Sequence, residues 1–269
     1  MVMDAESAER PGNRIAIALL TLVAWVLVTF LGAKVQLPGE PSLDDLVTRG
    51  IAWQIVLAGA LLVGVILWRR WRDIGFVAPE RGTLRLLWLP MLMILLQLGF
   101  ALLLGLPSAG VILLVLVNTL FVGFSEETMF RGVLYRALRG RMGIWPAILL
   151  VSVAFGGVHV LNGFITGVFA AAALQALMAA CSGLLLMAIF LRTGSLWVAI
   201  VYHALWDAAT FVVTLGASDR VAGTADRATE AAGANGAAAF VLPFLMVLPN
   251  LLYALWLLRS VHRSPPPGD

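Results

Sequence analysis

Two adjacent glutamates, Glu126 and Glu127, and the nearby Arg131 lie inside an apolar run that is long enough to cross a bilayer. A charged side chain at that depth costs roughly 3 kcal/mol or more, so it persists where it is paired or lines a functional cavity. Glu127 and Arg131 are four residues apart with the acid first, the favourable order for an ion pair along a helix. Glu126 points about 100° away and has no such local partner. We therefore assign Glu127 and Arg131 a supporting role and Glu126 the chemistry.

Two of the three histidines, His159 and His203, and one further carboxylate, Asp207, also lie in apolar runs. Measured from the arginine-rich end of each run, Glu126 and His159 are both roughly 20 Å deep at ~1.5 Å per residue. On the same rise His203 and Asp207 are roughly 12 and 18 Å deep, and their spacing of four places them on one helix face. The depths predict that four polar groups from three helices share one layer of the membrane and form one site.

Phe155 precedes His159 by four residues and so forms a wall on the same helix face. Gly156 and Gly157 between them allow a neighbouring helix to approach closely. A carboxylate held near histidines in a low-dielectric cavity is the usual arrangement for a general base. The sequence therefore favours hydrolysis by a water molecule that Glu126 activates.

A serine or cysteine nucleophile is disfavoured. Ser125 adjoins the glutamates but has no histidine at a suitable spacing, and Cys181 is the single cysteine of the chain and lies alone in an apolar run. A lone cysteine also excludes an intramolecular disulfide.

The composition predicts the scaffold that must hold these groups. Of 269 residues, 61% are hydrophobic and only 12% are charged, which indicates an all-α polytopic membrane protein. We expect one integral membrane domain over residues 1–269, built as a bundle of about eight transmembrane helices. The apolar segments are 14–34, 50–68, 85–106, 110–139, 144–162, 165–191, 195–216 and 237–258. The run 110–139 has no proline or turn cluster and is expected to be one long helix.

The basic residues predict the orientation. Of the 18 Lys and Arg residues all but four fall at one end of the predicted bundle, and the exceptions are Lys34, Arg49, Arg220 and Arg227. The positive-inside rule then places both termini in the cytoplasm, with the cytoplasmic membrane as the location. The arginines are expected to meet anionic lipid headgroups, and no nucleic-acid module is present. We predict a flexible extracytoplasmic loop over 217–236 and a disordered tail over 263–269.

Three motifs on successive apolar segments resemble those of the CPBP family of intramembrane proteases, which includes type II CAAX prenyl endopeptidases and bacterial Abi-type proteins. They are the two glutamates and the arginine within 126–131, Phe155 with His159, and His203 with Asp207. The resemblance covers about residues 110–210, which we regard as the catalytic core. It implies that Glu126 and His159 activate the attacking water, while His203 and Asp207 polarise the scissile carbonyl and stabilise the oxyanion.

The sequence departs from the prenyl-protein-processing members at Asp207, where those proteins have asparagine. A carboxyl group donates to an oxyanion only when protonated, so Asp207 either carries a proton or orients His203. Many members are described as metalloproteases, and Glu126, His159 and His203 would be the ligands if zinc were bound. The chain lacks the His-Glu-x-x-His helix of zinc proteases, and no cofactor is predicted.

Three other interpretations of the same residues stay open. The polar groups can form a structural network between helices, a proton relay of a transporter, or the remnant site of a non-catalytic scaffold. Repeated halves, which would favour a transporter, are not found in the sequence. The favoured prediction is an intramembrane endopeptidase whose partners are the lipid bilayer and a membrane-associated peptide or protein substrate. The sequence predicts neither the identity of that substrate nor the oligomeric state.

Overall fold

The computed structural model describes residues 11–222 and 235–261, and this part of the chain contains helices and no strands. Its longer helices follow the predicted apolar segments closely, so the all-α fold is confirmed. They are α1 (Pro11–Gln36), α3 (Trp53–Arg69), α4 (Trp88–Leu104), α5 (Ala109–Glu127), α7 (Ile144–His159), α9 (Phe169–Thr193), α10 (Leu196–Ala222) and α12 (Asn235–Leu258). The short elements are α2 (Leu43–Thr48), the 3-10 helix η1 (Thr83–Leu87), the π-helix η2 (Thr128–Leu134), α6 (Tyr135–Arg139) and α8 (Asn162–Thr166).

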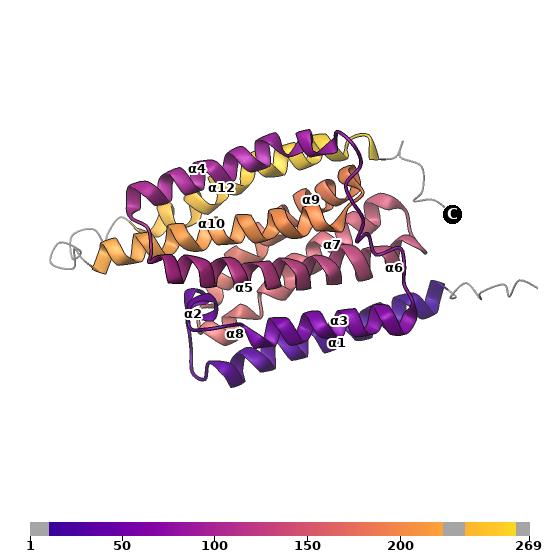
Figure 1. The fold of residues 1–269 in the computed structure, drawn as a ribbon, viewed down its shortest axis with the longest axis horizontal. Coiled ribbons are helices and arrows are strands. Elements are labelled where there is room, and N and C mark those ends of the chain that lie inside the picture. Colours follow the sequence, from indigo (N-terminus) through magenta and orange to yellow (C-terminus); the bar gives the residue numbers. More distant parts are fainter. Residues whose placement is uncertain (1–10, 223–234, 262–269) are drawn as a thin grey trace, which may run out of the picture.

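The helices run side by side along the long axis of the molecule (Figure 1). α4 and α12 lie together along one edge and α1 and α3 along the opposite edge, with α5, α7, α9 and α10 between them. Within this middle group α7 packs against α9 and α5 packs against α10. The three predicted motifs are carried by α5 with η2, by α7 and by α10, which all belong to the central group.

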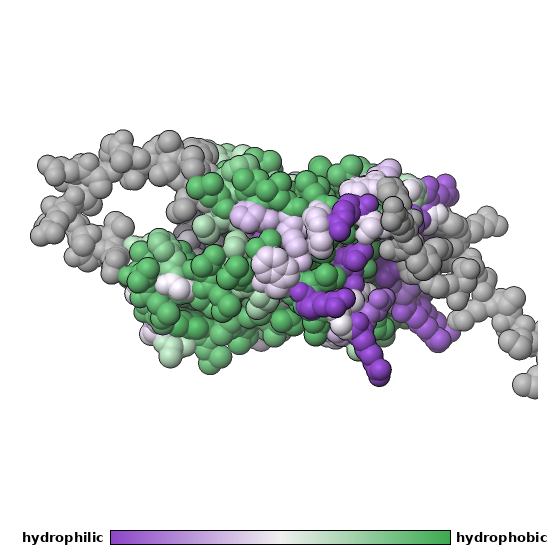
Figure 2. Space-filling view, turned by 90° about the horizontal axis from the view of Figure 1, so that it is seen from above, coloured by the Kyte–Doolittle hydropathy of each residue, from purple (hydrophilic) through white to green (hydrophobic). Residues whose placement is uncertain are grey.

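The lateral surface is apolar, and the charged groups gather at one end (Figure 2). Six of the helical segments in the described chain are long and apolar enough to cross a membrane, and two shorter apolar helices lie beside them. Leu20, Leu67 and Leu103 illustrate the surface, since each side chain is 70% exposed. A surface of this kind needs lipid rather than water around it, so the chain is an integral membrane protein.

The arginine-rich end is the end at which α1 begins and α3, α6 and α9 end (Figures 1 and 2). A non-helical segment, residues 71–82, covers the ends of α9 and α10 there. The backbone N–H of Leu196 donates to Gly75 O at 2.7 Å, and the N–H of Glu80 donates to Thr193 O at 2.9 Å. The opposite end is formed by α2 and α8 (Figure 1).

The run 110–139 was expected to be one long helix, and the structure has one helical span over Ala109–Arg139, inside which the hydrogen-bonding pattern changes. The α-helix ends at Glu127 and is followed by a π-helical stretch, in which the N–H of Tyr135 donates to Phe130 O, five residues back. All seven residues of this stretch are buried, and Gly132 lies against Ile74 of the covering segment. Tertiary packing thus widens the helix without any proline. π-Helical stretches are rare in proteins, and those that occur are frequently found at functional sites.

Both ends of the predicted loop over 217–236 are helical, because α10 continues to Ala222 and α12 begins at Asn235. Residues 223–234 lie outside the described residues, as does the predicted tail over 263–269.

Candidate active site

A fully buried ion pair lies where α5 passes into the π-helix. Arg131 Nη1 is 3.0 Å from Glu127 Oε1, and both side chains have no solvent exposure. Arg131 Nη2 also donates to the carbonyl of Gly183 on α9 at 3.0 Å, and the guanidinium lies 4.4 Å from the centre of the Phe155 ring. The predicted pair of Glu127 and Arg131 is therefore present, and it joins the end of α5 to α7 and α9.

His203 on α10 lies between three carboxylates. Its Nδ1–H donates to Glu127 Oε1 at 2.8 Å, while Nε2 is 3.3 Å from Asp207 Oδ2 and 3.8 Å from Glu126 Oε2. A neutral imidazole carries one N–H, so the bond to Glu127 leaves Nε2 as the unprotonated nitrogen, whereas an imidazolium would donate on both sides. The sequence did not predict the contact with Glu127, because it joins residues of different helices that show no spacing relationship.

His159 stands near the end of α7 and is oriented by its own helix. The Nδ1 of His159 forms a hydrogen bond of 2.8 Å with the carbonyl of Phe155, four residues earlier. As a carbonyl only accepts, Nδ1 carries the proton and Nε2 is the free nitrogen of a neutral ring. The Phe155 ring lies edge-on to both histidines, with centroids 5.1 Å from His159 and 5.8 Å from His203. Phe155 is thus the predicted wall, and it serves both rings.

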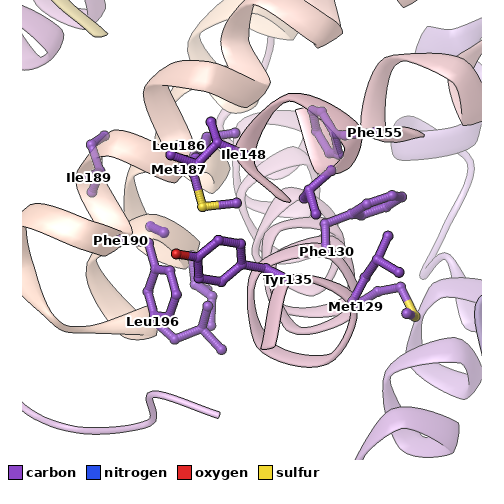
Figure 3. Close-up of a cluster of buried hydrophobic side chains, with 14 of the residues drawn as sticks. Met129, Phe130, Tyr135, Ile148, Phe155, Leu186, Met187, Ile189, Phe190 and Leu196 are labelled. Atoms are coloured by element: carbon purple, nitrogen blue, oxygen red, sulfur yellow. The ribbon is translucent and has the colours of Figure 1, made fainter. Parts of the chain in front are cut away.

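Phe155 also belongs to the buried hydrophobic core, together with Phe130, Tyr135 and Phe190 (Figure 3). Phe130 meets Phe155 at a centroid distance of 5.2 Å, and Tyr135 meets Phe190 of α9 at 6.2 Å. Both pairs adopt the edge-to-face arrangement that aromatic rings prefer. Because Phe130 and Tyr135 flank Arg131 along the chain, this packing holds the π-helical stretch in place from both sides.

Glycines allow the helices of the site to meet. A Cβ on Gly123 of α5 would be 2.7 Å from Ile200 O of α10, and one on Gly156 of α7 would be 2.7 Å from Ala180 Cβ of α9. The prediction of close approach is confirmed for Gly156. It is wrong for Gly157, which has open space where a Cβ would stand, because that residue faces away from α9.

Among the described residues, the carboxylate of Glu126 has a long ion-pair contact, 3.8 Å from Oε2 to Nε2 of His203, and no short one. Its side chain is 12% exposed, and Oε2 is buried and accepts no hydrogen bond from the described residues. Glu126, His159 and Asp207 all line one cavity of 160 Å3. A water molecule takes up about 30 Å3 of liquid volume, so this space admits several. The remaining lining is largely apolar and comes from α1, α2, α3, α5, α8, α9 and α10 as well as α7.

The structure thus brings Glu126, His203 and Asp207 within hydrogen-bonding or near-contact range and places His159 on the same cavity. Glu127, Arg131 and Phe155 surround them. The sequence did not predict Thr29 and Gln54 as cavity residues, and it also missed two cavity amides that contact each other, Asn162 and Gln175. These two amides could have been found in the sequence, because Asn162 follows His159 by three residues and Gln175 is a polar residue inside an apolar run.

The side chains do not fit the alternative zinc site well. Within the described chain no group of three His, Cys, Asp or Glu side chains is arranged to hold one metal ion. We therefore derive no step that passes through a metal.

Residues 108–209 match the family model of type II CAAX prenyl endopeptidase Rce1-like proteins. This segment contains α5 to α9 and the part of α10 that carries His203 and Asp207. It therefore includes all three motifs identified in the sequence. The resemblance to CPBP intramembrane proteases is thereby confirmed, and the segment is a domain of the CAAX-protease type. The comparisons with curated proteins and with solved structures gave no match.

Proposed function

We propose that this protein is an intramembrane endopeptidase that hydrolyses a peptide bond of a membrane-associated protein or peptide. The observation that carries the proposal is the buried, unpartnered Oε2 of Glu126, which lies 3.8 Å from His203 on a cavity shared with His159 and Asp207. A carboxylate is costly to bury without a partner, so its retention beside two imidazoles fits a group that acts on a bound water. The match to CAAX-protease-type proteins supports the same reaction class.

In the proposed reaction Glu126 accepts a proton from a water molecule that also hydrogen-bonds Nε2 of His159. The water oxygen forms a bond to the scissile carbonyl carbon, and the carbonyl oxygen becomes an oxyanion. His203, as an imidazolium, lies beside Glu126 and would donate to that oxygen through Nε2, and Asp207 would donate when it is protonated, a type of stabilisation worth about 10²–10³ in rate for each donor. The carbon–nitrogen bond then breaks as Glu126 passes its proton to the leaving amine, which yields two peptide ends.

Glu127, Arg131 and Phe155 act on the geometry rather than on the substrate. Glu127 fixes the ring of His203 through Nδ1, and Arg131 neutralises and holds Glu127. Phe155 packs against both histidine rings and limits their rotation. Orienting contacts of this kind commonly contribute about 10- to 100-fold to a site that depends on histidines.

The orientation forms part of the proposal. The arginine-rich end is assigned to the cytoplasm by the positive-inside rule, with the cytoplasmic membrane as the location. The cavity is lined by α2 and α8, which form the opposite end. In this orientation the substrate reaches Glu126 from the extracytoplasmic half of the membrane.

The decisive experiment uses protein purified in detergent and a library of quenched fluorescent lipopeptides. Glu126→Ala, His159→Ala and His203→Ala are expected to abolish cleavage, while Cys181→Ser, a change inside α9 away from the cavity, leaves it intact. Cleavage that survives all three alanine substitutions would overturn the assignment of these residues as the site of hydrolysis, whereas a wild type that cleaves no peptide of the library would favour a scaffold or a transporter. A chelator arm tests the zinc-dependent version, since loss of cleavage that added zinc restores would establish it.

A further inference from the structure

Three side-chain amides line the cavity, and two of them, Asn162 and Gln175, are hydrogen-bonded to each other. Asn162 begins α8, three residues after His159, and Gln175 lies on the facing part of α9. The Nδ2 of Asn162 donates to Oε1 of Gln175 at 2.8 Å, and both residues line the cavity with Glu126 and His159. Both side chains are partly buried, so they are neither surface groups nor core groups.

The bond between them leaves a defined set of unused hydrogen-bonding atoms. Asn162 retains Oδ1 as an acceptor and the second N–H of Nδ2, and Gln175 retains the two N–H donors of Nε2; Oδ1 of Asn162 and Nε2 of Gln175 have no hydrogen bond within the described residues. Exchanging the oxygen and nitrogen of both amides would place the free acceptor on Gln175 and the free donors on Asn162, which would reverse the roles of the two variants in the test below. Polar groups inside a membrane protein need partners, because lipid offers none.

Asn118 shows what a purely structural amide looks like in this protein. Its Oδ1 accepts from the N–H of Ala52 at 3.0 Å, and its Nδ2 donates to the carbonyls of Val47 and Gly50 at 3.0 and 2.8 Å. Both ends of that amide are bonded to backbone, and its side chain is completely buried. The pair of Asn162 and Gln175 differs because its free atoms are on a cavity.

A peptide unit offers one N–H donor and one carbonyl acceptor, which is the complement of one free acceptor and one free donor. We propose that Asn162 and Gln175 bind the main chain of the substrate, with one peptide unit next to the scissile bond held between Asn162 Oδ1 and Gln175 Nε2. This inference rests on the proposed protease function. It gives both amides a positioning role and predicts that the site recognises an extended main chain at this position independently of the side chain there.

The test compares the best-cleaved lipopeptide of the library with analogues in which one non-scissile N–H at a time is replaced by an ester oxygen. Wild type is expected to show a raised KM, by about tenfold or less, for the analogue that lacks the N–H facing Asn162. Asn162→Ala is expected to raise KM for the parent peptide by a similar factor and to abolish the difference between peptide and ester. Gln175→Met should raise the KM for the parent peptide and for the ester analogue by the same factor, so the ratio between the two KM values stays as in wild type.

Gln97→Ala is the matched control, because Gln97 on α4 accepts a hydrogen bond from Thr210 on α10 and does not line the cavity. It should leave the KM for each ester analogue unchanged. If Asn162→Ala does not fold, as judged by its melting curve in detergent, Asn162→Leu and Gln175→Met provide the same comparison. If the rise in KM from the parent peptide to the ester analogue is the same in wild type and in the folded Asn162 variant, the main-chain role is wrong. The proposed protease function would be unaffected by that result, because both proteins still cleave the peptide. If wild type cleaves no peptide, the protease proposal fails and the main-chain role fails with it.

Discussion

The Nδ1–H of His203 on α10 donates to Oε1 of Glu127 at 2.8 Å, and the same oxygen is 3.0 Å from Arg131. One carboxylate oxygen therefore links the π-helical stretch to α10. The second oxygen of Glu127, Oε2, is buried and has no hydrogen-bond partner among the described residues. The two neighbouring glutamates thus have different environments, because Glu127 is bonded on one oxygen to two side chains, while Glu126 lines the cavity and its buried Oε2 has no hydrogen bond from the described residues.

Glu127→Gln is expected to impair both folding and activity. The substitution leaves the Arg131 guanidinium buried without a carboxylate, and breaking a buried pair in this way costs about 3–5 kcal/mol. His203 would also lose its charged acceptor, so activity should fall by about 10- to 100-fold. Unfolding curves in detergent and cleavage rates measure the two effects. A Glu127→Gln variant with wild-type stability would show that the ion pair does not hold the bundle.

Glu126→Gln is expected to give the opposite combination, no cleavage together with unchanged or increased stability. A buried carboxylate oxygen without a partner is destabilising, and the amide removes the charge at constant shape. Proteins commonly lose stability at catalytic groups in this manner. The same melting experiment serves as the measurement, with Glu127→Gln run alongside. Strong destabilisation by Glu126→Gln would instead indicate a structural network.

Asp207→Asn and Asp207→Ala separate the two roles open to Asp207, whose Oδ2 is 3.3 Å from Nε2 of His203. An asparagine keeps a donor for the oxyanion, so Asp207→Asn should retain kcat within about tenfold, whereas Asp207→Ala should lose about 10²–10³ in kcat. Steady-state kinetics on one peptide substrate is sufficient. If asparagine is as damaging as alanine, Asp207 acts by accepting a hydrogen bond from His203.

Much of this arrangement follows from patterns along the chain. Length and apolar composition indicate each membrane helix, and the depth of Glu126 and His159 can be counted from the arginine-rich end with a fixed rise per residue. Spacing of four residues also predicts the contacts of Glu127 with Arg131 and of Phe155 with His159, both of which are present. These relationships are local, so they need no knowledge of how the helices pack.

The rest depends on packing between helices. No proline or glycine cluster in the sequence predicts the π-helical stretch. It occurs where Arg131 donates a hydrogen bond to Gly183 O and Gly132 packs against Ile74. The contact of Glu127 with His203 joins residues 76 positions apart, and periodicity within one helix cannot predict it. Gly156 and Gly157 look equivalent in the sequence, and only the position of α9 distinguishes them.

Gly156→Ala is expected to destabilise the protein, while Gly157→Ala is tolerated. A Cβ on Gly156 would lie 2.9 Å from the backbone N of Ala180, so α7 and α9 would have to separate, which costs about 1–3 kcal/mol. A Cβ on Gly157 meets nothing within 4 Å. Melting curves of the two variants test this, and the cleavage rate of Gly156→Ala should fall because His159 lies at the end of the displaced helix. Equal stability of the two variants would contradict the packing of α7 on α9.

The proposed orientation can be tested with the single cysteine as the starting point. In a Cys181→Ser background, Glu40→Cys places a thiol in the connection between α1 and α2, and Arg81→Cys places one in the segment that covers the arginine-rich end. Both positions are exposed, so a membrane-impermeant maleimide reacts with whichever thiol faces the outside of intact cells. The positive-inside rule predicts labelling of Glu40→Cys in intact cells and of Arg81→Cys only after permeabilisation. The reverse pattern would place α2, α8 and the cavity on the cytoplasmic side, and substrates would then have to approach Glu126 from the cytoplasm.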